Sequence, residues 1–139
     1  MKWKIGISYG ALVWFISFLI EYFIYPSKLF YSPLFEMIMI ITFVLIGSIF
    51  LILYIKESEN FNFIEGVKLG ILFFTINIII EFLTIIIMLV DIFLSGDLMN
   101  MLFFNYIVDT WMTNLEYPVL AYLVYPILGA FSGYIYDLE

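Results

Sequence analysis

The chain has 139 residues, of which 65% are hydrophobic, 22% aromatic and only 12% charged. This composition lies far outside the range of soluble domains and is typical of an integral membrane protein. Four spans of about 20 residues each would use more than half of the chain and leave no room for a separate soluble module. We therefore expect a single transmembrane domain over residues 1–139 whose main partner is the lipid bilayer.

The residue types that are missing exclude several kinds of chemistry. The sequence has no Cys, no His and no Arg. Disulfides, thiolate nucleophiles, Cys- or His-ligated metals and most haem ligation are thereby excluded. Five Lys residues and a net charge of −7 leave no basic surface for nucleic acid. We expect no cofactor, no metal site, no nucleic-acid partner and no enzymatic activity.

Four apolar stretches predict transmembrane helices, at residues Ile5–Tyr25, Met37–Ile55, Leu69–Val90 and Tyr117–Tyr136. A short turn that contains Pro26 and Pro33 joins the first two spans, and the polar stretch 56–68 separates the two halves of the chain. Pro126 falls inside the fourth span and predicts a kink there. The expected fold is an all-α bundle of four transmembrane helices.

The distribution of lysines predicts the orientation in the membrane. Four of them, Lys2, Lys4, Lys56 and Lys68, fall on the side that carries both termini, and only Lys28 falls on the other side. Because positive charges are enriched in cytoplasmic loops, we expect a multi-pass protein of the cell membrane with both termini in the cytoplasm.

The connection between the third and fourth spans, residues 91–116, is expected on the outer side and carries four carboxylates but no Lys. Its apolar residues recur at a helical spacing, and Trp111 suits the headgroup layer, so a short interfacial helix is predicted. Such a helix either covers the end of the bundle or acts as a lid.

Two of the spans resemble each other when the sequence is shifted by 60 residues. Residues 10–21 then fall on residues 70–81, so that Gly10 meets Gly70 and Glu21 meets Glu81. This pattern predicts two tandem helical hairpins, residues 1–59 and 60–139, related by a pseudo-two-fold axis along the membrane normal. Chance resemblance between two apolar helices is the alternative explanation.

Small and polar residues form a stripe along each of these two spans. The first stripe is Gly6, Gly10, Trp14, Ser17 and Glu21, and the second is Gly70, Phe74, Asn77, Glu81, Thr84, Met88 and Asp91. Steps of three and four residues place each set on one helix face. Because polar residues avoid lipid and small residues let helices approach, both stripes should face inward and bring Glu21 close to Glu81.

The two intramembrane glutamates are the candidate functional residues. An ionised carboxylate in the hydrocarbon layer costs about 2.5 to 3.5 kcal/mol, and no predicted span carries a basic residue to neutralise it. We interpret Glu81 and Glu21 as a proton- or cation-binding site, with Asn77, Ser17 and Thr84 as neighbours. The alternative is that each glutamate is a neutral, hydrogen-bonded packing residue, or that Glu21 reaches the outer interface.

The fourth span adds further candidates. Tyr122 and Tyr125 are suited to bind a buried carboxyl group or to line a cation path, although tyrosine at the end of a span is also a common interface anchor. Gly129 and Gly133 form a GxxxG pattern, which permits close contact between helices. With Gly10 and Gly70, they are the predicted helix-packing residues.

Two functions from different classes follow from these features. The first is a small proton- or cation-coupled transporter or channel that uses Glu81 and Glu21 and, at this size, works as a homodimer. The second is a non-catalytic subunit or assembly partner of another membrane protein, which short loops and the lack of reactive side chains favour.

Overall fold

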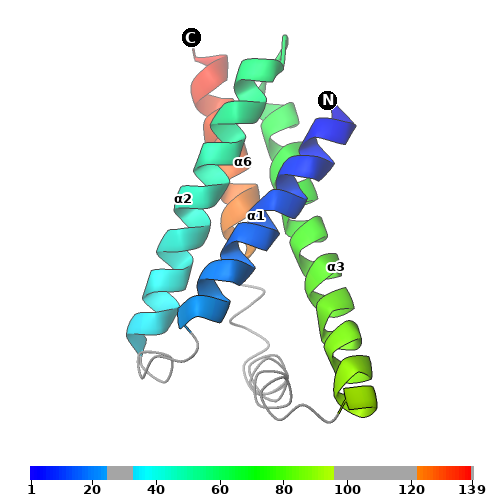
Figure 1. The fold of residues 1–139 in the computed structure, drawn as a ribbon. Coiled ribbons are helices and arrows are strands. Elements are labelled where there is room, and N and C mark those ends of the chain that lie inside the picture. The colour runs from blue at the N-terminus through cyan, green and yellow to red at the C-terminus, as the bar shows by residue number, and fades with distance from the viewer. Residues whose placement is uncertain (25–32, 96–121, 139) are drawn as a thin grey trace.

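The computed structural model describes residues 1–24, 33–95 and 122–138. In these ranges the chain forms four α-helices, α1 (Trp3–Ile24), α2 (Pro33–Glu57), α3 (Phe63–Ser95) and α6 (Val124–Asp137). Helices α1 and α3 run in one direction and α2 and α6 run in the other, so that both termini lie at the same end (Figure 1). The all-α architecture agrees with the sequence prediction.

The four helices pack as a ring. Helix α1 contacts α2 and α3, and α6 contacts α3 and α2, with the most extensive interface between α3 and α6. The interior is filled largely by aromatic side chains, among them Phe43, Phe73, Tyr122 and Tyr125. Toward its C-terminal end α3 diverges from α1 and α2 (Figure 1).

Three of the helices are long and apolar enough to cross a membrane, over residues Trp3–Ile24, Met37–Glu57 and Phe63–Asp91. The 22 residues of α1 extend for about 33 Å, close to the thickness of the hydrocarbon layer. Large apolar side chains are exposed along the outward faces of all three helices, as contact with lipid requires. The chain is therefore a small multi-pass membrane protein.

The structure confirms only part of the predicted fourth span. Helix α6 has 14 residues and extends for about 21 Å, which is too short to cross the hydrocarbon layer. The first residues of that predicted span, 117–121, lie outside the described residues. Pro126 lies in the first turn of α6, where the missing N–H and the fixed φ suit the start of a helix, and the kink stays a prediction because residues 117–121 before it are not described.

Helix α3 is longer than predicted at both ends. It begins at Phe63 because Asn62 caps it, with the Glu65 N–H donating to Asn62 Oδ1 at 2.9 Å. The Phe63 N–H donates to Asp137 Oδ2 at 2.9 Å, so the end of α6 supplies a second cap. At its other end α3 continues through Asp91 to Ser95. This run takes up the start of the predicted interfacial segment, and residues 96–116 lie outside the described residues.

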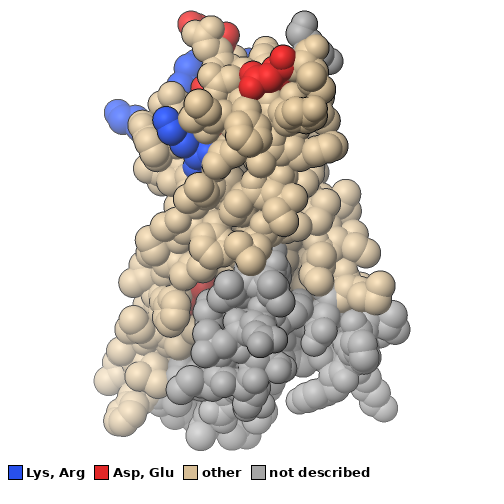
Figure 2. Space-filling view, turned by 180° about the vertical axis from the view of Figure 1, so that it is seen from behind, with Lys and Arg blue, Asp and Glu red and all other residues tan. Residues whose placement is uncertain are grey.

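Charged side chains gather at the end of the molecule that carries both termini. Figure 2 shows the lysines and several carboxylates there, and one carboxylate well away from that end. Glu65 accepts hydrogen bonds from Tyr54 Oη at 2.8 Å and from Ser58 Oγ at 3.0 Å, and it lies 3.9 Å from the Met1 amino group. These contacts join α1, α2 and α3 at the polar end of the bundle. Which side of the membrane this end faces stays a prediction.

Candidate functional site

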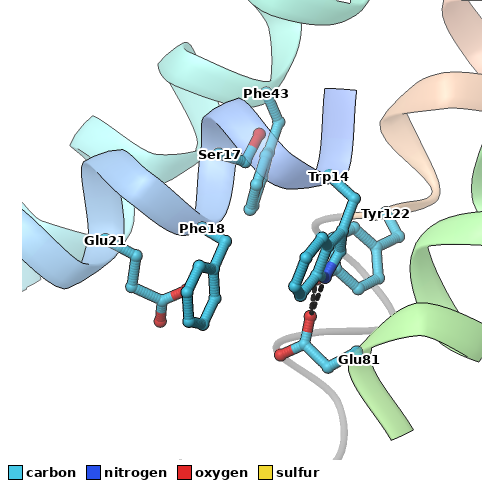
Figure 3. Close-up of a pocket in the computed structure, with 7 residues that line it drawn as sticks. All are labelled: Trp14, Ser17, Phe18, Glu21, Phe43, Glu81 and Tyr122. Atoms are coloured by element: carbon cyan, nitrogen blue, oxygen red, sulfur yellow. Dashed lines mark hydrogen bonds between the residues drawn. The ribbon is translucent and has the colours of Figure 1, made fainter. Parts of the chain in front are cut away.

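Glu81 lies half-buried in the middle of α3 and joins three parts of the chain. The indole Nε1–H of Trp14, on α1, donates to Glu81 Oε2 at 3.3 Å. The hydroxyl of Tyr122, just before α6, donates to the same oxygen. Figure 3 shows Trp14 and Tyr122 side by side next to the Glu81 carboxyl group. A carboxyl group in the membrane-spanning part of α3 is thus held by donors from two other segments.

Glu21 shares a pocket with Glu81 but does not form a hydrogen bond with it. The pocket has room for about one water molecule (about 10 Å³) and is lined by Trp14, Ser17, Phe18, Glu21, Phe43, Glu81 and Tyr122. In the view of Figure 3 the ring of Phe18 lies between the two carboxyl groups. Glu21 has no hydrogen-bond partner among the described residues. The two glutamates therefore converge on one small space from α1 and α3.

Asn77 lies one turn before Glu81, but its side-chain amide is bound to backbone carbonyls. Its Nδ2 donates to Phe73 O at 2.7 Å and to Gly10 O at 3.4 Å. The side chain is completely buried between α1 and α3. Because the amide nitrogen faces these two carbonyls, the orientation of the amide is fixed and Asn77 does not bind Glu81.

Thr84 also lies near Glu81 without binding it. Its hydroxyl donates to Ile80 O of the preceding turn at 2.9 Å. Its side chain lines a second, adjoining pocket whose walls are Trp14, Phe18, Glu81, Thr84 and Ile85. Of the three predicted neighbours, only Ser17 lines the pocket that both carboxyl groups share.

The predicted packing glycines lie at helix contacts. Gly10 faces the side chains of Phe73 and Ile76 on α3, and Gly70 faces the backbone of Tyr125 and Pro126. On α6, Gly129 faces the backbone of Gly66, and Gly133 faces the backbone of Phe63. The α3–α6 interface is therefore a contact of backbone on backbone, and it sets the position of Tyr122, which precedes α6.

Two contributors to the site were not among the sequence candidates. Trp14 belongs to the predicted stripe on the first span, and an indole N–H one helix away from a buried carboxyl group is a signal for a hydrogen bond. Gly66 forms a second GxxxG pattern with Gly70, which is visible in the sequence as residues 66–70. Trp14 joins α1 to α3 through its hydrogen bond to Glu81, and Gly66 lets α6 approach α3 closely.

The lining of the pocket determines what chemistry it can support. It contains two carboxyl groups, two hydroxyl groups and aromatic walls, and none of the described lining residues is basic. Across the described part of the chain, no group of three or more Asp or Glu residues is placed to hold a metal ion. The arrangement is suited to holding a proton or a small cation.

Comparisons of the sequence with protein-family models and with curated proteins, and of the fold with solved structures, gave no match. The feature of the described residues that points to a function is the pocket lined by α1, Phe43 of α2, Glu81 of α3 and Tyr122.

Proposed function

We propose that this small polytopic membrane protein binds a proton or a small monovalent cation at Glu81 and Glu21, and that it is a proton- or cation-coupled transporter or channel. The observation that carries this proposal is the convergence of two carboxyl groups, from different helices, on one pocket among apolar spans. Negative charge in the hydrocarbon layer is costly, and none of the described lining residues offsets it with a positive side chain. A bound positive charge removes that cost.

The dimensions of the pocket support a small ligand. A space of about 10 Å³ takes one water-sized group, whereas an organic cation does not fit without movement of the helices. The aromatic side chains of Trp14, Phe18 and Phe43 form apolar walls beside the carboxyl groups and lower the local dielectric constant. In such a low-dielectric setting the attraction between a carboxylate and a cation is stronger than in water.

The hydrogen bonds to Glu81 support a second candidate as well. Trp14 and Tyr122 satisfy one carboxyl oxygen within the protein, so that Glu81 also serves to join α1 and α6 to α3. A residue with only this packing role fits a non-catalytic subunit or an assembly partner of a larger membrane complex. The two candidates differ in whether ions cross the membrane.

The test is ion flux into liposomes that contain the purified protein. We expect a flux of protons, Na⁺ or K⁺ down an imposed gradient with the wild type, and loss of that flux with Glu81→Gln. Glu59→Gln, in the exposed connection between α2 and α3, is the matched control and should keep the wild-type flux. Unchanged flux in Glu81→Gln would contradict the proposal. No flux from the wild type under any gradient, with another membrane protein co-purifying, would support the assembly partner instead.

A further inference from the structure

Buried hydroxyl groups next to the carboxyl pocket have no hydrogen-bond partner in the part of the chain that the structure describes. They are Ser17 Oγ and Tyr125 Oη, and Asn77 Oδ1 shares this property. Ser17 is 4% exposed and Tyr125 is 0% exposed. A buried polar group without a partner carries the full cost of its desolvation. Such groups in a native structure point to a bound water or ion.

One of the two hydroxyl groups, that of Ser17, lines the pocket, and the other lies beside it. Ser17 lines the pocket one helical turn before Glu21. The Tyr125 hydroxyl lies near Ser17, although the two do not form a hydrogen bond of normal geometry. The ring of Tyr125 stacks on that of Tyr122, with the ring centroids 6.2 Å apart. Ser17 therefore belongs to the same pocket as Glu21, and the Tyr125 hydroxyl lies beside Ser17, outside the lining of that pocket.

The position of the Tyr125 hydroxyl is fixed by its surroundings. The rings of Phe43 and Phe73 lie 6.3 and 6.2 Å from its ring, centroid to centroid, and Gly47 of α2 packs against one ring edge. A side chain held on these sides does not turn its hydroxyl toward another partner. The unsatisfied hydrogen-bonding capacity of Tyr125 thus stays directed at the region of Ser17.

The pocket favours a water molecule over a divalent metal cation. A buried water needs two to four polar partners and about 10 to 15 Å³ of space, which this pocket and its hydroxyl groups supply. Hard divalent cations in proteins take about six oxygen ligands. Here the side-chain oxygens come from Glu21, Glu81, Ser17 and Tyr122, and a space of about 10 Å³ leaves no room for water ligands beside such an ion.

We infer that Ser17 and Tyr125 hold a water molecule against Glu21, and that this water delivers protons to and from the Glu21 carboxyl group, so that the ligand of the pocket is the proton. This inference rests on the proposed function and specifies its ion. In the forward step a protonated water gives one proton to a Glu21 carboxylate oxygen and becomes neutral water, and the reverse step removes the proton. Among the described residues, the titratable groups that share the pocket with Glu21 are Glu81 from α3 and Tyr122 just before α6, Tyr125 of α6 lies beyond Ser17, and the described lining residue from α2 is Phe43.

The experiment compares Ser17→Ala and Tyr125→Phe with two matched controls. Ser8→Ala removes an exposed serine hydroxyl of α1 that donates to Lys4 O, and Tyr134→Phe removes an exposed tyrosine hydroxyl of α6. In liposomes, Ser17→Ala and Tyr125→Phe should lower proton flux by about tenfold or more, and the controls should not change it. A Na⁺ gradient should neither drive flux nor inhibit the proton flux.

The outcomes separate the inference from the function on which it rests. Normal proton flux in Ser17→Ala and Tyr125→Phe, with flux still lost in Glu81→Gln, would overturn the water while leaving the proposed function in place. Flux that is driven or blocked by Na⁺ would show that the ligand is a metal cation and not the proton. Absence of any flux from the wild type would remove the proposed function and the proton step together. Thermal unfolding then tests the bound water alone. Loss of the water should lower the Tm of Ser17→Ala and of Tyr125→Phe below the Tm of the controls. An unchanged Tm in these two variants would contradict the bound water.

Discussion

At the scale of single residues, the setting of Glu81 depends on two donors that meet at one oxygen. An indole N–H can only donate, so Trp14 requires an acceptor inside the bundle, and Glu81 Oε2 supplies it at 3.3 Å. Tyr122 directs its hydroxyl to the same atom. The Glu81 carboxyl group therefore links α1 and the segment just before α6 to α3.

Removing either donor should weaken the contact between these segments. Interhelical hydrogen bonds in membrane proteins contribute about 0.6 kcal/mol on average and up to about 1.7 kcal/mol. We expect Trp14→Phe and Tyr122→Phe each to lower the free energy of unfolding by about 0.5 to 2 kcal/mol, measured by denaturation in detergent. Trp3→Phe, at an exposed position of α1, is the control. Equal stability of Trp14→Phe and Trp3→Phe would mean that the indole hydrogen bond contributes nothing.

At the polar end, Glu65 is the residue on which the hydrogen-bond network depends. Tyr54 is 1% exposed, accepts the Lys2 backbone N–H at 2.8 Å and donates to Glu65, which also accepts from Ser58. Glu65→Ala leaves these donors without an acceptor and should cost about 1 to 3 kcal/mol in unfolding free energy. Glu59→Ala, at an exposed position nearby, should cost little. A smaller loss for Glu65→Ala than for Glu59→Ala would contradict the role of this network.

At the scale of elements, α3 and α6 pack through glycines whose neighbours are backbone atoms. A Cβ added to Gly66 would collide with the carbonyl oxygen of Gly129, and one added to Gly133 would lie 2.6 Å from the Cα of Phe63. Neither neighbour can rotate away. At Gly10, by contrast, the nearest atom is the terminal Cδ1 of the Ile76 side chain, at 2.9 Å, which can move.

This difference predicts an order of severity among alanine substitutions. Gly66→Ala and Gly129→Ala should lower unfolding free energy by about 1 to 3 kcal/mol or more, because the two helices must separate. They should also reduce ion flux, since Tyr122 moves away from Glu81 when α6 moves. Gly10→Ala should have the smaller effect in both measurements. An equal loss of unfolding free energy in Gly10→Ala and Gly66→Ala would contradict a special sensitivity of the backbone contact between α3 and α6.

The long helices could be predicted from sequence because uncharged apolar runs of sufficient length leave few alternatives. The start of α6 could not, because Pro126 is compatible both with a first turn and with a kinked interior, and apolar composition does not distinguish them. The start of α3 depends partly on Asp137, far along the chain, which accepts the Phe63 N–H. Such a cap exists only once α3 and α6 are packed together.

The candidate site, too, could be predicted from the sequence only in part. Helical periodicity correctly placed Glu21 and Glu81 on inward faces, where they line one pocket. Periodicity does not say which side chains reach a carboxyl group, so Asn77 was expected near it and instead binds the carbonyls of Phe73 and Gly10. The donor from Trp14 depends on the relative height of α1 and α3, which their close approach at Gly10 determines.

At the scale of the whole molecule, the two termini and the α2–α3 connection lie together at one end (Figure 1). The lysines described by the structure lie at the same end (Figure 2). Because positive charges are enriched on the cytoplasmic side, we expect that end to face the cytoplasm.

Cysteine labelling tests this orientation without background, because the chain has no native Cys. Single cysteines at Glu59 and at Leu138 should react with a membrane-impermeant maleimide only in inverted membrane vesicles, and a cysteine at the outward-facing Phe15 of α1 should stay unlabelled in both orientations. Labelling of the first two positions in intact cells would reverse the orientation. Labelling of the two from opposite sides would contradict the fold itself.

We expect the carboxyl groups of the pocket, Glu21 on α1 and Glu81 on α3, to hold a proton within the membrane, and carbodiimide labelling detects this state. A hydrophobic carbodiimide reacts with protonated carboxyl groups, and mass spectrometry locates the adduct. We expect modification of Glu81 or Glu21 at neutral pH, a decline as the pH rises and the carboxyl groups lose their protons, and no intramembrane adduct in the double variant with Glu21→Gln and Glu81→Gln. Modification confined to the glutamates of the polar end, such as Glu57 and Glu59, with both pocket residues unreacted at every pH, would contradict the claim.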